Sequence, residues 1–207
     1  MKYQAVIWDI DGTLLNTEEG LVAAYQYTIE KLKLPHKTAE EIKGFIGPVP
    51  QAVFQDRFLM NSEDAQAAAD VFRNRYKNFE LFRAVPYTGI MEVLRKIKSA
   101  GIKQAVATNK RQDYAVDICR HFGIDDYCHP ILGPDNVNTK TKSDFIKECV
   151  SRLGVEKAVM IGDTNGDKNA AEEAESDFLG VNYGFGFKRE NGYADTPADI
   201  AKILGVS

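Results

Sequence analysis

Residues 5–17 read AVIWDIDGTLLNT and contain the first strong structural signal in the chain. Its first four residues are apolar and are followed at once by Asp9-x-Asp11-Gly12, the pattern of a short buried strand that ends in a turn. The apolar run is too short for a transmembrane helix, and its two aspartates do not suit a signal peptide. We therefore expect a buried strand with two carboxylates at its carboxyl end.

Similar apolar segments recur along the chain and alternate with amphipathic ones. Strands are predicted at residues 103–107, 129–132, 158–161 and 177–181. Helices are predicted at residues 89–100, 111–122 and 143–153, each followed by a glycine that favours a helix end. This alternation predicts an α/β fold with a doubly wound parallel sheet, whose ligands gather at the carboxyl ends of the strands.

One long segment interrupts the alternation. Residues 18–83 contain helical patterns, at residues 20–32, 51–58 and 62–82, without a convincing strand. We expect residues 1–17 and 84–207 to form the α/β core and residues 18–83 to form an all-helical insertion after the first strand.

Composition narrows the class of partner. The 207 residues, 44% of them hydrophobic, suffice for one full core and a smaller second unit. The net charge of −4 argues against a sequence-independent nucleic-acid binder, which needs an excess of Lys and Arg. Three cysteines without metal-ligand or disulfide spacing favour a reducing cytosol. We expect a cytoplasmic monomer or homodimer that binds a small, mobile substrate, with no nucleic-acid or membrane partner.

The residues that could carry chemistry come directly after the predicted strands. Carboxylates from neighbouring strand ends would make a strongly negative, oxygen-rich pocket, which suits a hard cation such as Mg²⁺. The ion would screen the carboxylates from an anionic substrate. The candidates are Asp9 and Asp11 after the first strand, Thr108, Asn109 and Lys110 after the second, and Asp163 and Asp167 after the fourth.

Three of these segments resemble motifs of the haloacid-dehalogenase-like superfamily. Residues 9–17 resemble its first motif, D-x-D-G-T-L-x-x-[ST], residues 105–109 its second, and residues 161–167 its fourth, G-D-x-x-x-D. The resemblance covers nearly the whole chain and implies a Rossmann-like core with a small helical cap. Residues 45–54 resemble a cap segment of phosphoglycolate-phosphatase-like and nucleotidase-like members.

The resemblance also implies roles. Asp9 would attack phosphorus and become transiently phosphorylated, while Asp11 would protonate the leaving group and then deprotonate water. Asp9, the backbone carbonyl of Asp11 and the Asp163 side chain would hold Mg²⁺, with Asp167 behind them. The Thr108 hydroxyl and the Asn109 backbone amide would bind phosphate oxygens.

The third motif, a lysine before a helix, has two candidates. Lys142 directly precedes a helix that opens with Ser, Asp and two apolar residues, as in some relatives, and we favour it. Lys140 has the spacing from Asp144 that the K-P-x-P-D form of the motif would give, and it is the alternative. Either ammonium group would stabilise the phosphate and the ionised nucleophile.

These features predict a magnesium-dependent phosphatase acting on a small phosphate monoester, phosphoglycolate or a similar metabolite. A sugar phosphomutase resembling β-phosphoglucomutase, a nucleotidase or pyrophosphatase, and a silent phospho-ligand-binding module are the alternatives. The glycine-rich residues 183–187 would either border the site or form a surface turn.

Overall fold

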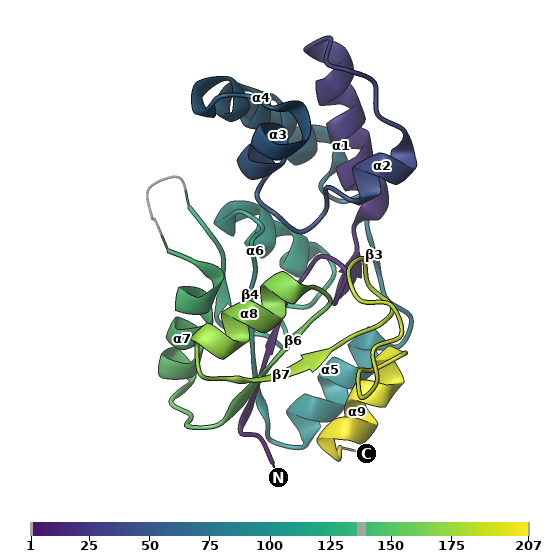
Figure 1. Cartoon of the computed structure of the whole chain (residues 1–207). Coiled ribbons are helices and arrows are strands. Elements are labelled where there is room, and N and C mark those ends of the chain that lie inside the picture. The colour runs from purple at the N-terminus through teal and green to yellow at the C-terminus, as the bar shows by residue number, and fades with distance from the viewer. Residues whose placement is uncertain (1, 136–139, 207) are drawn as a thin grey trace. The chain divides into compact units, whose positions relative to one another are not determined.

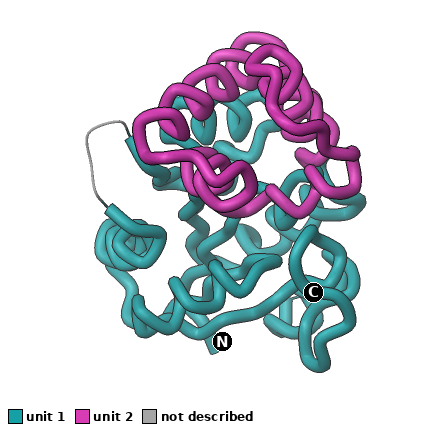
Figure 2. The backbone as a smooth tube through the Cα atoms, turned by 45° about the horizontal axis from the view of Figure 1, so that its top comes forward, with its two compact units in different colours: residues 1–16, 85–207 teal, residues 17–84 magenta. Residues whose placement is uncertain are grey.

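The computed structural model describes residues 2–135 and 140–206, and the chain divides into two compact units. Figure 2 colours them separately: one contains Met1–Asn16 and Val85–Ser207, and the other contains Thr17–Ala84.

The first unit contains a parallel sheet with the strand order β5-β4-β1-β6-β7 (Figure 1). Its strands are β1 (Ala5–Trp8), β4 (Lys103–Ala107), β5 (Ile131–Leu132), β6 (Ala158–Gly162) and β7 (Asp177–Gly180). Trp8 pairs with Val106 on one side and with Ile161 on the other, so the carboxyl ends of the three central strands are level. Strands β4 and β5 lie on one side of β1, and strands β6 and β7 lie on the other. The strand order therefore reverses at β1, which is a topological switch point.

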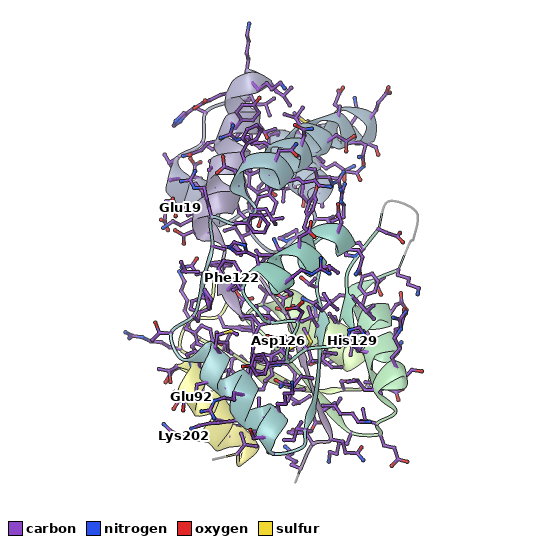
Figure 3. The ribbon with its side chains drawn as sticks, turned by 180° about the vertical axis from the view of Figure 1, so that it is seen from behind. Glu19, Glu92, Phe122, Asp126, His129 and Lys202 are labelled. Carbon is purple, nitrogen blue, oxygen red and sulfur yellow. The ribbon has the colours of Figure 1, made fainter. Side chains whose placement is uncertain are left out.

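Helices cover both faces of this sheet. They are α5 (Ile90–Ser99), α6 (Gln112–His121), α7 (Lys142–Leu153), α8 (Asn165–Glu173) and α9 (Pro197–Leu204). One face packs against α7 and α8 through a cluster that includes Ile7, Ala105, Phe145, Ile146 and Met160. On the other face the Gln104 side chain receives a hydrogen bond from the Trp8 indole and donates one to Leu94 of α5. Helices α5 and α9 lie side by side there (Figures 1 and 3).

The predicted doubly wound α/β class is confirmed, and the differences from the predicted elements are local. The strand predicted over residues 129–132 is reduced to Ile131–Leu132, because Pro130 has no N–H to continue a ladder. Helices α8 and α9 were not predicted, although each begins with a capping box that the sequence contains, Thr164 with Asp167 and Thr196 with Asp199.

The second unit is helical. It contains α1 (Glu18–Lys31), α2 (Ala39–Lys43), α3 (Pro50–Phe58), α4 (Ser62–Arg75) and a π-helical turn over Tyr76–Glu80. The long helix predicted over residues 62–82 therefore ends as an α-helix at Arg75. Aromatic rings form its interior: Tyr25 lies 4.3 Å from Phe72 and 5.5 Å from Phe45, centroid to centroid. A short antiparallel pair, β2 (Leu15–Asn16) and β3 (Val85–Pro86), joins the two chain segments where they leave the first unit.

Candidate active site

The carboxyl ends of β1, β4 and β6 bring the predicted site residues to one edge of the sheet. Asp9 follows β1, Thr108 follows β4 and Asp163 follows β6, and all three are buried. The Asp9 amide donates to the Ile161 carbonyl at 2.9 Å, so the ladder of the sheet holds the backbone beneath the first carboxylate.

Asp9, Asp163 and Asp167 form a buried carboxylate cluster in which one oxygen from each lies within 4.8 Å of the others. Burial is the main cause that raises the pKa of Asp9 to about 6, with Lys142 opposing it and the neighbouring carboxylates adding to it. Burial, together with Asp9 and Asp167, raises the pKa of Asp163 to about 7. A positive charge beside these buried carboxylates would therefore stabilise their ionised forms.

Lys142 supplies part of that charge. Its Nζ lies 2.7 Å from Asp9 Oδ1 and also contacts Asp167 Oδ1. Burial lowers the pKa of Lys142, but the two carboxylates outweigh it and the net change is upward, so the side chain is a fixed cation. A capping box between Thr141 and Asp144 begins α7 directly at Lys142 and thereby sets where this lysine lies.

Lys140, the alternative for the third motif, lies elsewhere. Its Nζ is 2.7 Å from Glu148, and 46% of its side chain is exposed. Residues 138 and 139, which precede it in the sequence, lie outside the described residues. Between the two lysines, Lys142 is the one that touches the carboxylate cluster.

The two acids of the fourth motif have different surroundings. Asp167 uses Oδ2 to accept hydrogen bonds from the amide and hydroxyl of Thr164, and its Oδ1 contacts Lys142. Asp163 uses Oδ2 to accept from the amides of Phe185 and Gly186, whereas its fully buried Oδ1 has no hydrogen-bond partner among the described residues. An orphaned buried carboxylate oxygen is costly unless a cation satisfies it.

This donor set fits Mg²⁺, which prefers carboxylate and carbonyl oxygens. Asp9 and the free oxygen of Asp163 could hold the ion, and the backbone carbonyl of Asp11 lies in the same turn after β1. Both oxygens of Asp167 are already engaged, which suits a supporting position.

Asp11 and Thr108 lie close to a second buried lysine, Lys110. The Lys110 Nζ is 3.1 Å from Asp11 Oδ1, and its backbone amide donates to the Thr108 hydroxyl at 3.2 Å. The Asp11 side chain thus lies outside the carboxylate cluster of the described residues. The sequence analysis named Lys110 as a candidate beside Thr108 and the half-buried Asn109, without assigning it a role. Its position directly after β4 was the available signal.

Residues 6–181 match the sequence profile of the family described as haloacid dehalogenase-like hydrolase. The chain belongs to this family. The resemblance of the three motifs to this superfamily is therefore confirmed.

Haloacid dehalogenase-like relatives with curated names cover most of the chain. A 5'-nucleotidase of Pseudomonas aeruginosa is 29% identical over 92% of this chain and 87% of its own length. A phosphoglycolate phosphatase of Neisseria meningitidis is 30% identical over 88% of this chain and 82% of its own. Among solved structures, a predicted phosphatase from Clostridium acetobutylicum superposes with a TM-score of 0.91 at 28% identity, with each chain covered completely.

Within residues 2–135 and 140–206, every helix is too short or too polar to cross a bilayer.

Proposed function

We propose that this protein is a magnesium-dependent phosphatase that hydrolyses a small phosphate monoester through a phosphorylated Asp9. The observation that carries the proposal is the buried group of Asp9, Lys142 and Asp163, in which one Asp163 oxygen has no hydrogen-bond partner among the described residues. Paired nucleophile and cation beside an unsatisfied oxygen ligand are what phosphoryl transfer requires.

Magnesium, held by Asp9, Asp163 and the Asp11 carbonyl, would neutralise negative charge on the phosphoryl group when it is bound. Lys142 contributes a second, permanent positive charge at Asp9 Oδ1. Together they allow a phosphate dianion to approach a pocket that the carboxylates alone would repel.

The reaction has two displacements. Asp9 forms a bond to phosphorus, and the ester oxygen leaves with its electron pair and takes the proton of the Asp11 carboxylic acid. A water molecule then attacks the aspartyl-phosphate, Asp11 takes a proton from that water, and Asp9 leaves as a carboxylate. The Thr108 hydroxyl and the Asn109 amide bind the phosphoryl oxygens during both steps.

The names of the relatives support a substrate class. Curated relatives named phosphoglycolate phosphatase and 5'-nucleotidase support a small monoester, and phosphoglycolate is our first candidate. We assign residues 18–83 as the cap that selects the leaving group, because members of one fold differ in such inserted segments.

The experiment is phosphate release with Mg²⁺ across phosphoglycolate, nucleoside monophosphates, sugar phosphates and pyrophosphate. Asp9→Asn is the control, because it keeps the shape of the side chain and removes the nucleophile. Selective release that Asp9→Asn abolishes supports the proposal and names the substrate class. Isomerisation of a sugar phosphate without net phosphate release would indicate a phosphomutase instead. Full activity in Asp9→Asn would contradict the mechanism.

A further inference from the structure

We propose that the loop Tyr183–Phe187 is a positioning element for the cation site, because it holds Asp163 in the one orientation that leaves Oδ1 free. This inference rests on the proposed magnesium site and deepens it. It also places the glycine-rich segment, which the sequence left as either a border of the site or a surface turn, directly against the carboxylate.

The backbone amides of the loop donate hydrogen bonds to Asp163. Phe185 N–H donates to Asp163 Oδ2 at 2.6 Å, and Gly186 N–H donates to the same oxygen at 3.3 Å. Phe187 N–H donates to the Asp163 carbonyl at 2.8 Å. Since two donors converge on Oδ2, the carboxylate cannot turn without breaking both hydrogen bonds, and the lone pairs of Oδ1 stay available.

The approach of the loop requires glycine. A Cβ added at Gly184 would lie 2.4 Å from Asp163 Cβ and 2.4 Å from the Gly12 carbonyl. A Cβ added at Gly186 would lie 2.5 Å from the Asp163 carbonyl. Both distances are far inside van der Waals contact, so a side chain at either position would push the loop off the carboxylate.

Tyr183 anchors the loop to the turn that follows Asp9. Its hydroxyl donates to the Thr13 carbonyl at 3.0 Å, and its ring lies 4.7 Å from the ring of Tyr87. The same loop therefore contacts both the turn after Asp9 and the carboxylate of Asp163 on the neighbouring strand. These contacts help to fix the distance between Asp9 and Asp163.

A preorganised ligand binds a cation more tightly than one that must first be ordered, since the ordering is already done in the free protein. Loosening the loop should therefore weaken Mg²⁺ binding. The effect should appear in the dissociation constant, measured without any substrate.

The test is calorimetric titration of Mg²⁺ into the whole protein and its variants. Tyr183→Phe removes one anchoring hydrogen bond, and we expect a roughly three- to tenfold weaker affinity. Gly186→Ala displaces the loop itself and should weaken binding further. Asp163→Asn should abolish binding, because its amide can turn its oxygen to the loop and present N–H groups to the cation.

Two controls separate the loop from general damage. Gly44→Ala, in the helical unit, adds the same methyl group where the nearest atom is 3.2 Å away, and Tyr127→Phe removes a hydroxyl far along the chain from the loop. Both should bind Mg²⁺ like the wild type. Gly186→Ala is interpreted only if its circular dichroism is native, and Tyr183→Phe keeps the inference testable if it is not.

Wild-type affinity in Tyr183→Phe and in a folded Gly186→Ala, with binding lost in Asp163→Asn, would overturn the role of the loop and leave the metal site intact. Mg²⁺ binding that persists in Asp163→Asn, or is absent from the wild type, would contradict the proposed metal site itself.

Discussion

The ammonium group of Lys110 lies 3.1 Å from the carboxylate of Asp11, and only 3% of the Lys110 side chain is exposed. The site therefore contains two buried lysines with separate partners, Lys142 at Asp9 and Lys110 at Asp11. One is placed by the start of α7 and the other by the turn after β4. This division indicates that the proposed nucleophile, Asp9, and the proposed acid, Asp11, each have a cation of their own.

Lys110→Met should lower kcat/KM for phosphate release by about 10- to 100-fold, because loss of a charged hydrogen-bond partner costs about 1–3 kcal/mol. The apolar replacement preserves most of the buried stem. Lys202→Met is the matched control: this lysine of α9 is 75% exposed and lies at the surface (Figure 3). Equal activity in both variants would show that Lys110 does not support Asp11.

Lys142→Met should reduce activity far more than Lys140→Met. The first removes the cation that contacts Asp9 and Asp167 and leaves three carboxylates together. Breaking a buried ion pair in this way costs about 3–5 kcal/mol of stability. The second removes an exposed pair with Glu148, worth at most about 1 kcal/mol. Steady-state kinetics at saturating Mg²⁺ would compare them. A larger loss in Lys140→Met would reverse the assignment of the third motif.

Without divalent cations, titration of the carboxylate cluster should lower the free energy of unfolding as pH rises from about 4 to about 7. Burial, Asp9 and Asp167 raise the pKa of Asp163 to about 7 from its ordinary 3.8, so the folded state binds the proton more tightly than the unfolded chain. The stability contributed by this proton is complete below the unfolded pKa and is lost as pH passes the folded pKa.

The comparison that isolates this effect is urea unfolding of the wild type and Asp163→Asn in EDTA. Asparagine does not titrate, so the variant should gain at least about 1 kcal/mol relative to the wild type between pH 4.5 and pH 7.5. Added Mg²⁺ should stabilise the wild type at pH 7.5 and not the variant. Parallel pH profiles for the two proteins in EDTA would refute this account.

Glu80→Gln should destabilise the helical unit by about 1–3 kcal/mol. Glu80 is 1% exposed and its carboxylate contacts both Arg75 and Arg83, with 2.8 Å to the second. Because the charge is buried, its neutral replacement leaves two guanidinium groups without their shared partner. Thermal unfolding would measure the loss, with Glu92→Gln on the surface of α5 as the neutral control (Figure 3). An unchanged melting temperature in Glu80→Gln would contradict this role.

Much of the core could be predicted because its signals are local. A parallel strand is buried on both faces, so β1, β4 and β6 appear as short apolar runs, and the polar residue after each run falls at the same edge of the sheet. Helix α8 was not predicted because it is short and polar on its outer side. The π-helical turn after Arg75 escaped because π-helices have no comparable sequence signal.

The α/β class, the family and the carboxylates at strand ends could be inferred from sequence alone, since they depend on periodicity and on motifs within a few residues. Three relationships required the three-dimensional structure: which lysine contacts Asp9, that Lys110 pairs with Asp11, and which Asp163 oxygen has no partner among the described residues. Those relationships join residues 133, 99 and 22 positions apart. Contacts at such separations are set by how strands, helices and loops pack in three dimensions, which no local pattern records.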